Sequence, residues 1–128
     1  MVNIIRGLFI LICVTAPIGV NAHEMTPTYV KLMPSYMVGI HKASVRLYNR
    51  RSDVNYYQIG VFDSEFKPLP FTSLYKIVKV KHLNEASIDI YIKDEVVHKV
   101  VYVCSESKLN KQVNVRTAVA SRICSKVK

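Results

Sequence analysis

Two cysteines near the end of the chain are the residues best suited to covalent chemistry. The sequence has three cysteines: Cys13 lies in an apolar N-terminal segment, and Cys104 and Cys124 lie far from it. An even cysteine count in the exported part of a small protein favours a disulfide; the alternatives are two free thiols or a pair of metal ligands. A bridge closing this loop of 21 residues, counting both cysteines, is worth about 3 kcal/mol by chain-entropy reasoning. The spacing therefore predicts a disulfide between Cys104 and Cys124.

His23 is the candidate metal ligand. Cleavage of the chain after Ala22 would make His23 the first residue, with a free α-amine beside its imidazole. Amine and imidazole nitrogens suit Cu(II), and a second histidine completes such a site. His41, His82 and His98 are the candidates, but none stands at a ligand-like spacing from another histidine or an aspartate. A copper-binding exported protein is therefore the alternative function, and the main prediction has no metal and no cofactor.

Basic residues accumulate toward the C-terminus. The chain has 18 Lys and Arg against 9 Asp and Glu, a formal net charge of +9, and no acid follows Glu106. The cations in this last part are Lys108, Lys111, Arg116, Arg122, Lys126 and Lys128. Such an edge attracts acidic protein faces or an anionic surface such as lipopolysaccharide or membrane phosphate; the alternative is a solvated basic face. Nucleic acid is not predicted as a partner, because the sequence carries no nucleic-acid-binding motif.

Residues for catalysis are missing from the sequence pattern. There is no G-x-S-x-G nucleophile elbow, and the acidic residues are scattered along the chain. Asp94 and Glu95 adjoin, but such a pair is typical of a solvated turn. We therefore predict a protein that is not an enzyme.

The N-terminal residues 1–22 have the features of a secretory signal. Arg6 supplies the positive charge, residues 8–14 form a short apolar core, and small residues precede a cleavage point after Ala22. The apolar run is too short to cross about 30 Å of hydrocarbon as a helix, although an uncleaved anchor is the alternative. We expect a signal peptide at residues 1–22, one domain at residues 23–128, and a periplasmic or secreted protein without a membrane span.

Alternating apolar residues indicate the elements that position these groups. Strands are expected at residues 28–33, 43–49, 56–62, 76–81, 87–93, 99–105 and 115–126, with Pro34 ending the first. Seven short strands in a domain of this size predict an all-β, immunoglobulin-like sandwich. If the last two strands are antiparallel neighbours, Cys104 and Cys124 come opposite one another.

Four stretches follow one another in the order and spacing of a known family. They are residues 26–32 (TPTYVKL), 45–49 (VRLYN), 57–63 (YQIGVFD), and 101–103 (VYV) followed after a basic loop by 118–123 (AVASRI). Together they resemble the N-terminal domain of periplasmic pilus-assembly chaperones, the PapD-like family. The resemblance covers nearly all of residues 26–124 and implies the same sandwich fold.

The resemblance also implies an activity, the donation of the last strand to a protein subunit that lacks one. The side chains that would fill the subunit's groove are Val115, Thr117, Val119 and Ile123, unless they face the domain's own core. Thr117 is polar where the family has a larger hydrophobic residue.

Two departures from the family pattern concern its client-binding cleft. The family holds its client's terminal carboxylate with two cations, and the matching positions here are Tyr29 and Cys124, with Lys31 and Lys126 as the nearby cations. The family's second domain is absent from this sequence. We therefore expect a single-domain relative that binds another protein through its last strand or its basic edge. A structural piece of a larger particle is a further alternative.

Overall fold

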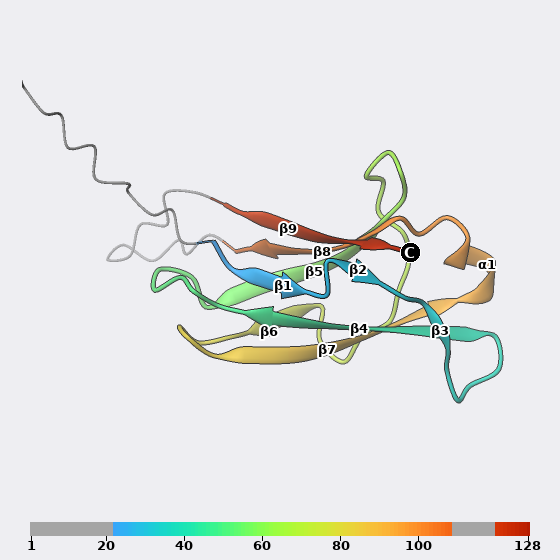
Figure 1. Ribbon diagram of the computed structural model, residues 1–128, viewed down its shortest axis with the longest axis horizontal. Coiled ribbons are helices and arrows are strands. Elements are labelled where there is room, and N and C mark those ends of the chain that lie inside the picture. The colour runs from blue at the N-terminus through green and yellow to red at the C-terminus, as the bar shows by residue number, and fades with distance from the viewer. Residues whose placement is uncertain (1–21, 109–119) are drawn as a thin grey trace, which may run out of the picture.

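Two β-sheets pack face to face in the computed structural model (Figure 1). The structure describes residues 22–108 and 120–128. Within these ranges the elements are β1 (Glu24–Thr26), β2 (Tyr29–Val30), β3 (Met33–Pro34), β4 (Ile40–Tyr48), β5 (Tyr56–Phe62), β6 (Ile77–Lys79), β7 (Glu85–Lys93), α1 (Asp94–Val97), β8 (Tyr102–Ser107) and β9 (Arg122–Val127). The predicted all-β, immunoglobulin-like sandwich is confirmed.

The two sheets differ in how their strands are arranged. In the first sheet β4 is central: β7 pairs antiparallel along its whole length, while β1 and β3 share its other side. The second sheet has the order β2-β9-β8-β5-β6, and all its pairs are antiparallel except β2 with β9. Thus β9 lies near one side of the second sheet, and β6 is its last strand on the other side.

The core lies between the sheets and follows the alternation of the sequence. One side of each long strand is apolar and buried, because successive side chains of a strand point to opposite faces. The buried residues include Val45 and Leu47 in β4, Tyr57, Ile59 and Val61 in β5, and Ile88, Ile90 and Ile92 in β7. The alternation of apolar residues that predicted these strands therefore corresponds to a buried face in each of them.

The first predicted strand, at residues 28–33, is wrong as a single element. The chain forms β1 against β4, crosses to the other sheet as β2 against β9, and returns as β3 against β4. Pro27 precedes the predicted strand and separates β1 from β2, because proline has no N–H to donate to a ladder. Pro34, expected to end the strand, is instead the last residue of β3.

Other predicted bounds need smaller corrections. Residues 94–97, expected to include a turn at Asp94 and Glu95, form the single helical turn α1, so the following strand β8 starts at Tyr102 rather than at residue 99. Strand β6 is shorter than residues 76–81. The described part of the last strand is β9, and residues 115–119 of the prediction lie outside the described residues.

No helix in the described part of the chain is long and apolar enough to cross a bilayer. Residues 1–21 lie outside that part, so the signal peptide stays a prediction.

Candidate functional site

The outer edge of β9 is the feature that bears most directly on strand donation. The backbone N–H and C=O groups of the odd-numbered residues in β9 point toward β8. Val127 N–H donates to Val101 O, and the C=O of Ser121, just before β9, accepts from Ser107 N–H. The backbone groups of the even-numbered residues point to the opposite side, where Lys126 N–H donates to Thr28 O beside β2. The backbone groups of the even-numbered Arg122 and Cys124 point to this same outer edge. On this outer edge, away from β8, no strand of the described residues pairs with Arg122 or Cys124.

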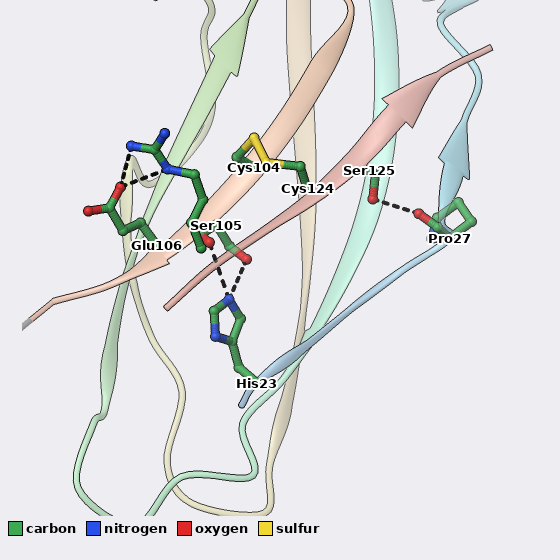
Figure 2. Close-up of a disulfide and its surroundings, with 8 residues drawn as sticks. His23, Pro27, Cys104, Ser105, Glu106, Cys124 and Ser125 are labelled. Atoms are coloured by element: carbon green, nitrogen blue, oxygen red, sulfur yellow. Dashed lines mark hydrogen bonds and ion pairs between the residues drawn. A yellow bond between two sulfur atoms is a disulfide. The ribbon is translucent and has the colours of Figure 1, made fainter. Parts of the chain in front are cut away.

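A disulfide holds this part of β9 against β8. Cys104 and Cys124 are directly opposite in the antiparallel register, and their sulfur atoms are bonded, as predicted (Figure 2). Their Cα atoms are 4.0 Å apart, as befits the closer, non-hydrogen-bonded type of antiparallel pair. The hydrogen bonds of Ser121 and Val127 on the β8 side place the hydrogen-bonded pairs at odd-numbered positions, so Cys124 belongs to a non-hydrogen-bonded pair. The bridge therefore fastens β9 to β8 at Cys124, one of the two residues whose outer edge is open.

A buried polar cluster lies at the base of the β8–β9 hairpin. His23 is 2% exposed; its Nε2 is 2.8 Å from Ser105 Oγ, and its Nδ1 is 3.1 Å from Ser121 Oγ. Ser121 N–H donates to Ser107 Oγ, and the Arg51 guanidinium reaches both Ser107 Oγ and Ser121 Oγ at 3.3 Å. We call these five residues the hairpin-base cluster. It joins the N-terminal segment to both strands of the hairpin.

Charges within and beside this cluster shift two pKa values. Burial lowers the pKa of His23, and the nearby Arg51 lowers it further, against the effect of the Ser105 backbone contact. Arg51 also binds Asp53 with two parallel hydrogen bonds of 2.9 and 2.7 Å, which lower the pKa of that carboxyl. The lowered pKa favours the neutral form of His23, and the charged Arg51 guanidinium beside it is paired with Asp53.

His23 was the candidate copper ligand, and the structure places its imidazole in the hairpin-base cluster. Of the other histidines, His41 Nδ1 lies 2.6 Å from Asp94 Oδ1, and His82 and His98 are exposed. The described residues include no group of three or more His, Cys, Asp or Glu that could hold a metal ion. The copper site stays a prediction.

Of the predicted partner-binding residues, some lie within the described part of the chain and others lie outside it. Val115, Thr117, Val119, Lys111 and Arg116 lie outside the described residues. Ile123 is half-buried and packs against the domain's own core. Lys108 Nζ donates to Gln58 Oε1 at 2.9 Å, and Arg122 forms an exposed ion pair with Glu106 at 2.7 Å.

The two positions that match the family's cationic anchors carry no cation of their own. Cys124 is held in the disulfide, and Tyr29 is 61% exposed and directly opposite Lys126 in the β2–β9 register. The nearest cation in this register is therefore Lys126, whose side chain is exposed.

The hairpin-base cluster is not predictable from the sequence. His23 and Ser105 are 82 positions apart, and Arg51 and Ser121 are 70 apart. The only local signal is the short spacing of Arg51 and Asp53, which on its own is typical of a polar turn.

No protein-family model matches the sequence, and no curated protein matches it. Among solved structures, the crystal structure of the periplasmic chaperone SfaE is similar, with a TM-score of 0.54 and 16% sequence identity. The match covers 84% of this chain and 56% of the chaperone, so the chain spans little more than half of that structure's length. At this identity the likeness shows the fold alone. The sandwich described here therefore has a PapD-like fold.

Proposed function

We propose that this protein is an exported, non-enzymatic module that binds another protein by β-strand addition, and that the region of its last strand is the added strand. The carrying observation is the open outer edge of β9 at Arg122 and Cys124, beyond the end that β2 covers. An edge with unpaired N–H and C=O groups is a template for pairing with a second chain. The PapD-like fold supports this proposal.

Side chains that precede β9 supply the apolar part of the contact. Ile123 is committed to the domain's own core, so the groove of the partner is filled by Val115, Thr117 and Val119. A fully buried valine is worth about 1.5–3 kcal/mol, so two of them are enough for a transient interface. Backbone hydrogen bonds along the edge add affinity that does not depend on the partner's sequence.

Rigidity of the edge favours this use. The disulfide ties β9 to β8, and the hairpin-base cluster ties the start of β9 to the N-terminal segment. Binding to an edge that is already ordered avoids part of the conformational entropy that association costs. The disulfide also fits an oxidising compartment, which supports export to the periplasm or out of the cell.

Charge defines the partner's surface. Arg122 is already neutralised by Glu106, whereas Lys126 and Lys128 are exposed and form no ion pair within the described residues. Together with Lys111 and Arg116, they favour a partner with an acidic rim around its apolar groove.

The test combines capture with hydrogen exchange. The mature chain captures its partner from an extract of the cell that produces it, and we expect Val119→Asp to abolish capture. Val38→Asp is the matched control, because Val38 is a fully exposed valine in the loop between β3 and β4. Amide exchange at Arg122 and Cys124 should slow in the purified complex, since these N–H groups become paired.

Two results would overturn the proposal. One is a complex in which exchange at Arg122 and Cys124 is as fast as in the free protein. The other is equal capture by wild type and by Val119→Asp, after thermal denaturation has shown that the variant is folded. Val115→Asp replaces Val119→Asp if that variant does not fold.

A further inference from the structure

An apolar groove lies on the opposite side of the sandwich from the β9 edge. Its volume is about 1010 Å³, and residues of β6 and β7 line it together with the segment that precedes β6. Core residues Val78 and Ile88 reach its wall, while Leu74, Tyr75 and Ile77 are 84%, 62% and 51% exposed. Three large apolar side chains exposed together beside a strand edge make this groove a candidate interaction site.

The strand that borders this groove has an unpaired edge. In β6 and the residues on either side of it, the backbone groups of the even-numbered residues point toward β5. Lys76 O accepts from Ile59 N–H, and Val80 N–H donates to Asn55 O. The N–H and C=O groups of Ile77 and Lys79 therefore point away from β5. Because β6 is the last strand of its sheet, no described strand pairs with these groups.

Across the groove, the edge of β7 is already partly occupied. Thr72 exchanges two backbone hydrogen bonds with Tyr91, and Ser73 Oγ donates to Asp89 O at 2.9 Å. The segment before β6 thus covers part of the outer edge of β7. This leaves β6 as the better place for an added strand.

The charge beside the groove is positive and not neutralised. Lys76, Lys79 and Lys81 form no ion pair with any carboxylate of the described residues. Asp89, which lines the groove, is already bonded to Ser44 Oγ at 2.6 Å and to Lys42 Nζ at 3.1 Å. A second copy of this chain, with a net charge of +9, would place cation against cation here. The occupant that fits the charge is acidic.

We propose that the groove between β6 and β7 binds an extended segment of a partner protein in which apolar and acidic residues alternate, by strand addition to β6. This site is independent of the strand donation proposed above. In the added strand, alternate apolar side chains enter the groove against Val78 and Ile88, and the acidic side chains lie on the outer face beside Lys79 and Lys81.

The probe is a short fluorescent peptide of alternating valine and glutamate, titrated with the full mature protein and followed by anisotropy. We expect Ile77→Asp and Lys79→Glu to weaken its binding roughly tenfold each, because both side chains lie on the outer face of β6 and each change places a negative charge beside the glutamates of the peptide. Val38→Asp, far from the groove lining, is the control for the first, and Lys31→Glu is the control for the second. A peptide of alternating valine and lysine should not bind.

Backbone methylation tests the geometry without any mutation of the protein. In an extended peptide the valine N–H groups point to one edge and the glutamate N–H groups to the other. Methylating one set should abolish binding, and methylating the other set should leave it intact.

Equal binding of both methylated peptides, or of the lysine peptide, would overturn the proposal. Lys79 would then serve only to keep a short edge strand from pairing, as lysines do at many sheet edges. Val119→Asp should not change peptide binding, so failure of this site and failure of strand donation are distinguished.

Discussion

The two ends of the five-stranded sheet are built in opposite ways. On the β9 side the chain is braced by a covalent bridge, by the hairpin-base cluster and by β2, which covers one end of the strand. On the β6 side a strand of three residues borders an apolar groove, and exposed side chains such as Leu74 and Tyr75 surround it. Both sides leave backbone groups of described residues unpaired on an outer edge, but the β9 side is fastened and polar, whereas the β6 side is short and apolar.

This difference fits two ways of pairing with another chain. A strand that is donated binds more tightly when it is ordered before it meets its partner, since ordering it on binding costs affinity. A strand that receives has to expose backbone groups beside apolar surface that an incoming segment can cover. We therefore infer that the β9 side donates and the β6 side receives.

Removal of the disulfide is the change with the largest expected effect on the braced side. Replacing Cys104 and Cys124 together by alanine should lower the free energy of unfolding by about 3 kcal/mol, because the unfolded chain gains the freedom of a large loop. Urea denaturation measures this loss. Partner capture through the last strand should weaken, while the valine–glutamate peptide should still bind to β6. Equal weakening of both would show that the two edges are not independent.

Asn49 is the corresponding support of the open side. Its Nδ2 donates to Val54 O at 2.7 Å and to Val80 O at 2.8 Å, and its Oδ1 accepts from Arg51 N–H and from the Tyr57 hydroxyl. Asn49→Ala should cost about 2 kcal/mol in urea denaturation, because it leaves buried polar groups without partners.

The second readout for Asn49→Ala is peptide affinity. Val80 directly follows β6, so peptide binding should weaken more than capture through the last strand. Asn55→Ala is the control: Asn55 is exposed, and its removal should change stability by less than about 0.5 kcal/mol. If both variants unfold at the same urea concentration as wild type, Asn49 does not support this edge.

The smallest expected effect is a pH dependence of the free energy of unfolding, and it is due to His23 on the β9 side. The pKa of His23 is lowered by burial, so below its ordinary value of 6.5 the unfolded chain binds a proton that the folded chain does not. Stability should therefore fall as the pH decreases from about 7.5 to about 5.5. Asp53 and Asp89 have lowered pKa values, so their protonation changes the free energy of unfolding only near and below their ordinary pKa of 3.8. This range lies below the pH window in which His23 acts.

The matched variant for this window is His23→Phe. It cannot titrate and keeps a ring next to Tyr57, whose ring centroid lies 4.5 Å from that of His23. Its free energy of unfolding should vary less with pH across the window than that of wild type. The same slope in both proteins would assign the pH dependence to other groups.

Local alternation in the sequence was enough to predict the long strands and their buried faces. In β5 the residues Tyr57, Ile59 and Val61 alternate with polar or small residues, and the bounds of this strand are as predicted. The disulfide was predictable as well, because Cys104 and Cys124 fall in two strands that a single hairpin joins. In both cases the signal lies within a short stretch of chain.

Three features were decided only by the tertiary structure. They are the division of the first strand between two sheets, the partners of His23 in the hairpin-base cluster, and the choice of which strand edges stay open. Each depends on hydrogen bonds between residues far apart in the chain, and side-chain periodicity carries no information about them. The sequence by itself determined which side chains face inward. Only the packing of the two sheets determined where the backbone is left to pair with another chain.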